Sequence, residues 1–154
     1  MSFPVDLGIP FTFGSMSLHN EGKRPLELEA IRLLPPLPDG FRLVQVLVAQ
    51  DRDRKFNSIG TSSQFPPARS DLGQLRPFHG LMVPNYDDNG RRSSAVLMGL
   101  QLDRPGTGTF KRVEIDYRVG SRRYTMKADF MFMACGPEVD FPTGCDSEAF
   151  FDEE

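Results

Sequence analysis

Apolar and polar residues alternate over the segment 113–135, and this alternation predicts a β-hairpin. Apolar side chains occupy every second position in two runs, which Gly120 and Ser121 separate. A two-residue turn at these positions would place Ile115 opposite Met126, so that the apolar side chains of both strands share one face. The hairpin indicates an antiparallel β protein, but it contains no catalytic group.

The polar face of the same hairpin carries charged side chains that the register would place opposite one another. Pairs of opposite charge across two strands contribute roughly 0.2–1 kcal/mol each, and like charges repel. Two pairs of opposite charge and one like-charged pair are expected: Glu114 with Lys127, Arg112 with Asp129, and Arg118 with Arg123.

Other candidate strands recur between turn signals. The runs 11–18 and 26–34 flank a turn at His19–Gly22, which predicts a second hairpin, and the apolar phase of the second run slips at Ala30 as a β-bulge would make it. With the 113–135 hairpin, seven or eight strands are expected. Their number and spacing are typical of an all-β, immunoglobulin-like antiparallel β-sandwich. The remaining candidate strands are 41–48, 57–62, 81–84 and 94–102.

Composition supports this fold class and excludes several functions. A chain of 154 residues is about one domain long, and its 13 Pro and 14 Gly favour frequent turns over long helices. A net charge of −3 with scattered arginines gives no footprint for nucleic acid. Without an apolar run of even ten residues, this segment is not expected to insert into a membrane. We expect the sandwich over 1–135 and a partly ordered Gly-, Pro- and acid-rich tail over 136–154.

The connection between Val48 and Leu81 is long for a compact domain and has little periodicity. Such loops are often functional, but we expect an excursion along the surface that apolar side chains fix to the sandwich. These side chains are Phe56, Ile59, Phe65, Leu72 and Phe78.

Four short motifs carry a resemblance to a known family. They are Leu18–Gly22 with Pro25–Leu28, then Ile59–Ser62, Gly80–Pro84 and Tyr117–Tyr124. Over Phe13 to Cys135, the chain resembles uncharacterised immunoglobulin-like domains of high-GC bacteria, which are usually held outside the membrane by an N-terminal anchor. The resemblance implies a fold and an extracytoplasmic, anchored setting. It implies no activity, because none of the motifs is catalytic.

Cys135 and Cys145 are the two cysteines of the chain, and they close a short loop rich in Gly and Pro. Such a loop can bring both side chains within disulfide reach, and in an oxidising compartment the bond would add roughly 2–3 kcal/mol. The alternative is two free thiols in a cytosolic protein.

Other candidate chemistry is weak, so neither an enzyme nor a cofactor is expected. His79 and Met82 form a soft-ligand pair, but no His or Met follows Cys135 as a blue-copper site requires. The segment Asn85–Gly90 resembles half of a calcium loop, with Val96 where glutamate should close it. No nucleophile motif accompanies the two histidines.

The alternation of the hairpin is lost at Phe130–Met133, where both faces are apolar. The register assigns Phe130 and Phe132 to the core, so the face of Met131 and Met133 needs a cover. One cover is the chain's own tail, through Phe141, Phe150 or Phe151. The other is a partner protein or self-association, because methionine suits adaptable interfaces.

The function expected from the sequence is a non-catalytic, extracytoplasmic interaction or scaffolding module with an unknown partner. A structural subunit of an assembly, such as a virion, is the alternative. A metal-binding or carrier domain that uses His79 and Met82 is a remote third possibility.

Overall fold

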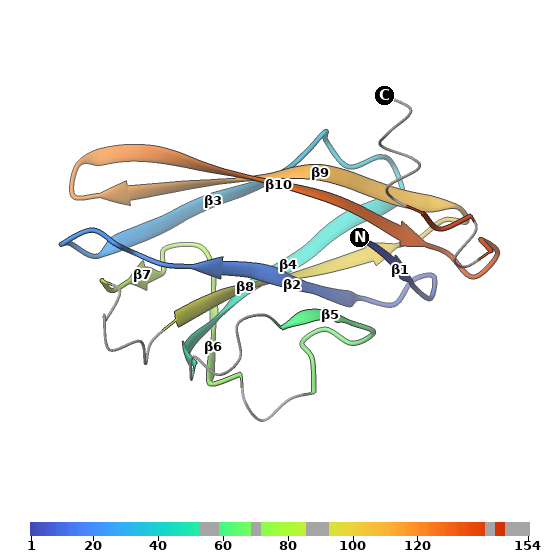
Figure 1. Ribbon diagram of the computed structural model, residues 1–154, viewed down its shortest axis with the longest axis horizontal. Coiled ribbons are helices and arrows are strands. Elements are labelled where there is room, and N and C mark those ends of the chain that lie inside the picture. The colour runs from blue at the N-terminus through green and yellow to red at the C-terminus, as the bar shows by residue number, and fades with distance from the viewer. Residues whose placement is uncertain (53–58, 69–71, 86–92, 141–143, 147–154) are drawn as a thin grey trace.

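Two packed β-sheets make up the part of the chain that the computed structural model describes, which is residues 1–52, 59–68, 72–85, 93–140 and 144–146 (Figure 1). The predicted all-β class is confirmed. The strands are β1 (Ser2–Pro4), β2 (Phe11–Leu18), β3 (Leu26–Leu34), β4 (Phe41–Arg52), β5 (Gly60–Ser62), β6 (Gln74–Pro77), β7 (Met82–Val83), β8 (Ser93–Leu102), β9 (Thr107–Val119) and β10 (Arg122–Cys135).

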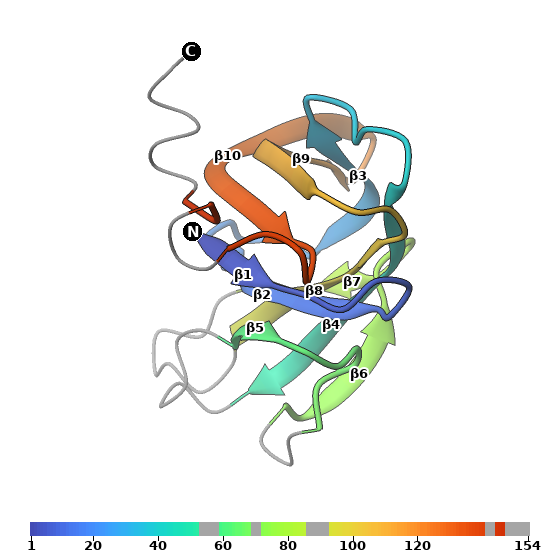
Figure 2. The same ribbon diagram turned by 90° about the vertical axis from the view of Figure 1, so that its right-hand side faces the viewer.

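Each sheet has five strands, and Figure 2 shows the two layers. The first sheet has the order β1-β10-β9-β3-β7, and the second sheet has the order β5-β2-β8-β4-β6. Neighbouring strands are antiparallel except β1 and β10, which are parallel. The expected strand number was too low for the described residues, because β1 and β6 were not predicted.

The predicted hairpin is confirmed as β9 and β10, with Ile115 opposite Met126. Gly120 in the turn has a φ of 61°, which glycine adopts without steric strain. The hairpin is longer than the predicted segment 113–135, because β9 begins at Thr107 and more and less buried residues alternate from there. Both predicted pairs of opposite charge form, with Arg112 Nε 2.8 Å from Asp129 Oδ1 and a looser 3.9 Å contact between Lys127 Nζ and Glu114 Oε1.

The like-charged pair Arg118 and Arg123 also lies opposite, as the register requires. Carboxylates of β3 offset the repulsion. Arg118 Nη2 donates to Glu27 Oε2 at 2.7 Å, and Glu29 lies 3.6 Å from both guanidinium groups. The predicted bulge in β3 is present between Leu28 and Ala30 and brings Glu29 into this position.

The predicted hairpin of 11–18 with 26–34 is wrong, although both strands have the predicted bounds. β2 pairs with β8 in the second sheet, whereas β3 pairs with β9 in the first. Each strand carries one apolar face, and the two faces meet in the core between the sheets. Asn20 in the connection donates to the carbonyl oxygens of Arg24 and Val83, which fixes the crossing.

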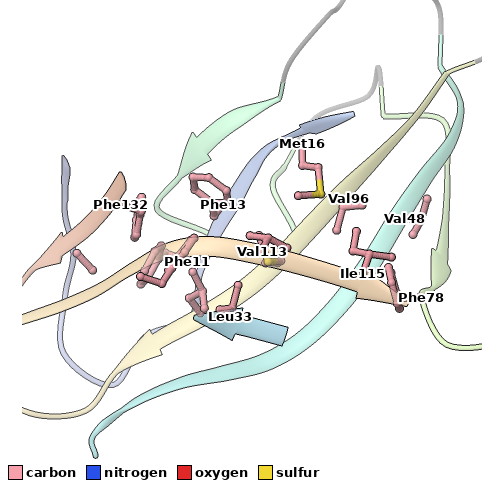
Figure 3. Packing of buried hydrophobic residues seen from close by; sticks show 14 of the residues in the cluster. Phe11, Phe13, Met16, Leu33, Val48, Phe78, Val96, Val113, Ile115 and Phe132 are labelled. Atoms are coloured by element: carbon pink, nitrogen blue, oxygen red, sulfur yellow. The ribbon is translucent and has the colours of Figure 1, made fainter. Parts of the chain in front are cut away.

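The core lies between the two sheets, and phenylalanine dominates one end of it (Figure 3). The ring of Phe13 lies 5.4 Å from that of Phe110 and 5.0 Å from that of Phe132. In β8, alternate residues from Val96 to Leu102 face this core, as predicted.

Part of the outer face of the second sheet is covered by the long connection. Ile59 and Leu72, from the long connection, are buried in a second cluster with Ala95 and Leu97 of β8. Phe65 packs on the same cluster, while Phe78 joins the main core; Phe56 lies outside the described residues.

Candidate functional site

The segment where the hairpin pattern fails contains a β-bulge. Asp129 pairs with Arg112 and Phe132 pairs with Phe110, so that Phe130 and Met131 together oppose a single residue of β9. Phe130 turns inward and lies 5.5 Å from the ring of Phe13. Met131 points outward and remains 50% exposed.

Met133 does not share the exposure of Met131. It is buried in a small cluster with Cys135, Cys145 and Val139, and β1 pairs beside it. The early part of the tail therefore covers one of the two methionines. Phe141, Phe150 and Phe151, which the sequence suggested as covers, lie outside the described residues.

A disulfide joins Cys135 to Cys145, with a Cα–Cα distance of 5.9 Å. Both residues are buried, which shields the bond from solvent. The bond ties the tail to the end of β10.

An open groove of about 560 Å³ lies beside Met131 on the outer face of the first sheet. Its apolar lining comes from Met131, Leu34 and Pro35. Its charged lining includes the Arg112–Asp129 ion pair, and the hydrogen bond from Arg112 to the carboxylate raises the arginine's pKa. The groove can hold an apolar side chain while offering both charge signs to the polar groups around it.

The rest of this outer face is charged and hydrogen-bonded. Arg32 donates to Asp116 at 2.5 and 2.9 Å and to Glu114 at 3.2 Å, and the hydroxyl of Thr125 donates to Asp116 at 2.7 Å. These hydrogen bonds, with that from Arg32 the larger cause, lower the pKa of Asp116 to about 2. Against this polar surface, the exposed thioether of Met131 stands out as an apolar feature.

The border of the first sheet is open along most of β10. β1 pairs only with Met133–Cys135, and among the described residues no strand pairs with β10 on that side from Arg122 to Phe130. The N-terminal amine donates to the carbonyl oxygen of Met131 at 2.7 Å and ends the open stretch (Figure 2). An open strand border can accept a further strand.

The metal candidates are not brought together with other ligands. His79 Nδ1 lies 2.6 Å from the carbonyl oxygen of Glu29, and Met82 is exposed on β7. No group of three His, Cys, Asp or Glu that could hold a metal occurs among the described residues. Most of the calcium-like segment, residues 86–90, lies outside them.

In the described part of the chain, no helix has the length and apolar character that crossing a membrane requires. No protein-family model matches the chain, and no curated protein or solved structure matches it significantly. The resemblance to immunoglobulin-like domains of high-GC bacteria therefore stays a prediction.

Proposed function

We propose that this protein is a non-catalytic interaction module, and that it binds an extended segment of another protein at the groove beside Met131. The observation that carries the proposal is the 50% exposed Met131 on the wall of a groove that combines apolar and charged lining residues. A flexible thioether adapts to different apolar anchors, and the Arg112–Asp129 pair supplies polar contacts beside it.

The accessibility of this face supports the proposal. The long connection covers part of the outer face of the second sheet with Ile59, Leu72 and Phe65, whereas no comparable layer covers the groove among the described residues. The described residues therefore leave the groove open to a binding partner.

An extracytoplasmic setting is part of the proposal. The Cys135–Cys145 disulfide supports it, because such bonds persist in oxidising compartments and are rare in the cytosol. The anchor expected from the resemblance would then hold the module at a bacterial surface.

The proposal also includes an immunoglobulin-like topology. In such domains, strands B and E are neighbours in one sheet and strands C and F in the other. The pairs β2–β8 and β3–β9 fit these two positions, and β10 beside β9 fits strand G. The inter-sheet disulfide and the buried Trp of antibody domains have no counterpart, since the chain's one disulfide ties its tail and it has no Trp.

Selection from a displayed library of random peptides tests the binding function. We expect peptides with one large apolar residue near charged residues to be enriched, and their binding to be lost in Met131→Glu. Val44→Glu is the matched control, because Val44 is 40% exposed on β4 of the opposite sheet. Failure to select any peptide, or equal loss in both variants, would reject the groove as the binding site.

A structural subunit of an assembly is the second candidate function. The open border of β10 favours it, because this border offers unpaired backbone groups to another chain.

A further inference from the structure

We propose that β10 binds β10 of a second copy of this chain, antiparallel and centred on Met126, so that the two first sheets join into one continuous sheet. This inference goes beyond the binding proposed at Met131 and does not depend on it. Its surface is the stretch Arg122–Phe130, which has no strand on its outer side among the described residues.

The backbone geometry decides which residues can make the new hydrogen bonds. In a hairpin with a two-residue turn, the pair that flanks the turn, Val119 with Arg122, is hydrogen-bonded, and the ladder then alternates. The N–H and C=O groups of every second residue from Arg123 to Asp129 consequently point away from β9. A second β10 must pair through these residues.

The charges favour the register centred on Met126 over its two neighbours among those that this alternation allows. With Met126 at the centre, Arg123 lies opposite Asp129 of the second copy, and by symmetry a second Arg–Asp pair forms. A shift to one neighbouring register would place Lys127 opposite itself, and a shift to the other would place it opposite Arg123. Like charges directly opposite destabilise a sheet, whereas opposite charges stabilise it.

The inner face of β10 supplies apolar contacts in the same register. Tyr124 is 44% exposed although its ring stacks on Tyr117 at 5.5 Å, so its outer edge has no cover among the described residues. In the pair of strands it would lie opposite Ala128 of the second copy, and the two half-buried Met126 side chains would meet.

The limits of the open stretch agree with this register. The Gly120-Ser121 turn ends it on one side, and the hydrogen bond from the N-terminal amine to Met131 ends it on the other. Met126 is the midpoint of Arg122–Phe130. The pairing therefore uses the whole open stretch and makes about eight backbone hydrogen bonds.

Analytical ultracentrifugation of the full chain, over micromolar concentrations, tests the association. We expect a species of twice the 17.3 kDa chain mass. Lys127→Pro should raise the dissociation constant by roughly a hundredfold, because proline removes an outward donor on each copy but no donor to β9. Lys127→Ala keeps the donor and should retain the dimer. A monomer at every concentration, or a dimer equally stable in the proline variant, overturns the proposal.

Cysteine cross-linking tests the register, and does so even if Lys127→Pro fails to fold. Both native cysteines are already bonded, so Met126→Cys introduces the single free thiol. In the proposed register two such thiols face each other across the two-fold axis, within disulfide reach. Mild oxidation should cross-link Met126→Cys into a covalent dimer and leave Ala128→Cys uncross-linked. Cross-linking of Ala128→Cys alone, or of neither variant, refutes this pairing.

Discussion

Replacing Phe13 with alanine should be among the most destabilising single changes in this protein. Phe13 on β2 is fully buried, and its ring lies 5.0–5.5 Å from those of Phe110, Phe130 and Phe132 on the opposite sheet. Loss of a buried phenylalanine costs about 3–5 kcal/mol, since the transfer free energy is lost and a cavity remains. We expect the upper half of that range, because the three rings are held by two paired strands and cannot move in to fill the space.

Tyr124→Ala is the matched control, because Tyr124 is 44% exposed and makes one stacking contact. It should cost about 1 kcal/mol. Urea unfolding followed by far-ultraviolet circular dichroism measures both variants, since the chain has no Trp for fluorescence. A loss below about 1.5 kcal/mol for Phe13→Ala, or a loss equal to the control, would refute the assignment of this aromatic cluster as the centre of the core.

Three further predictions concern the hairpin and the disulfide. Ile115→Asp should lower the free energy of unfolding by several kcal/mol, because it buries a carboxylate. Glu114→Thr should change the free energy of unfolding by less than about 1 kcal/mol. Equal effects of the two variants would contradict the assignment of Ile115 to the inner face and Glu114 to the outer face of the hairpin. Asp116 has a folded pKa of about 2 against an ordinary 3.8, so its stabilising effect is complete above pH 3.8 and is lost toward pH 2. As the pH is lowered from 3.8 to 2, the melting temperature of Asp116→Asn should therefore fall less than that of the wild type. Protein unfolded without reductant should resist alkylation, because Cys135 and Cys145 are bonded; two alkylated thiols would exclude the bond. Reducing the bond should lower the free energy of unfolding, measured in urea, by roughly 2–3 kcal/mol.

The hairpin was predictable because all its determinants are local. Alternation defines both strands, Gly120 permits the turn, and a two-residue turn fixes the register from Val119–Arg122 onward. The bulge at Ala30 was equally visible, since one inserted residue shifts the apolar phase.

The pairing of strands that are distant in sequence was not predictable from local patterns. Alternation shows that β2 and β3 each have one buried face, but it does not show which sheet each strand joins, and the structure separates them. β1 and β6 are too short to have a period, and their pairing depends on β10 and β4 as templates.

Only part of the candidate site was predicted, because the sequence shows local patterns and not the contacts between distant segments. The sequence shows that both faces are apolar at Phe130–Met133, but it does not show the bulge that makes Met131 exposed. The cover over Met133 comes from the disulfide loop, which belongs to the tail that the sequence offered as a cover, and from β1, whose pairing with β10 has no local signal. Leu34 and Pro35 of the groove have no sequence signal, because only folding brings the end of β3 beside the bulge.

One end of β10 is covered and the rest of its border is open, and this contrast favours a role in association for the open part. At Met133–Cys135 the strand is closed by β1 on its border and by the disulfide loop on its face. From Arg122 to Phe130 it has neither cover among the described residues. Exposed borders are usually protected from pairing by charged side chains, especially Lys, by proline or by bulges. This stretch carries Lys127 but no proline, and Arg123 and Asp129, which are opposite in charge, lie three residues on either side of Met126. With Met126 at the centre, this arrangement pairs opposite charges at both ends of the open stretch, whereas the two neighbouring registers bring like charges together.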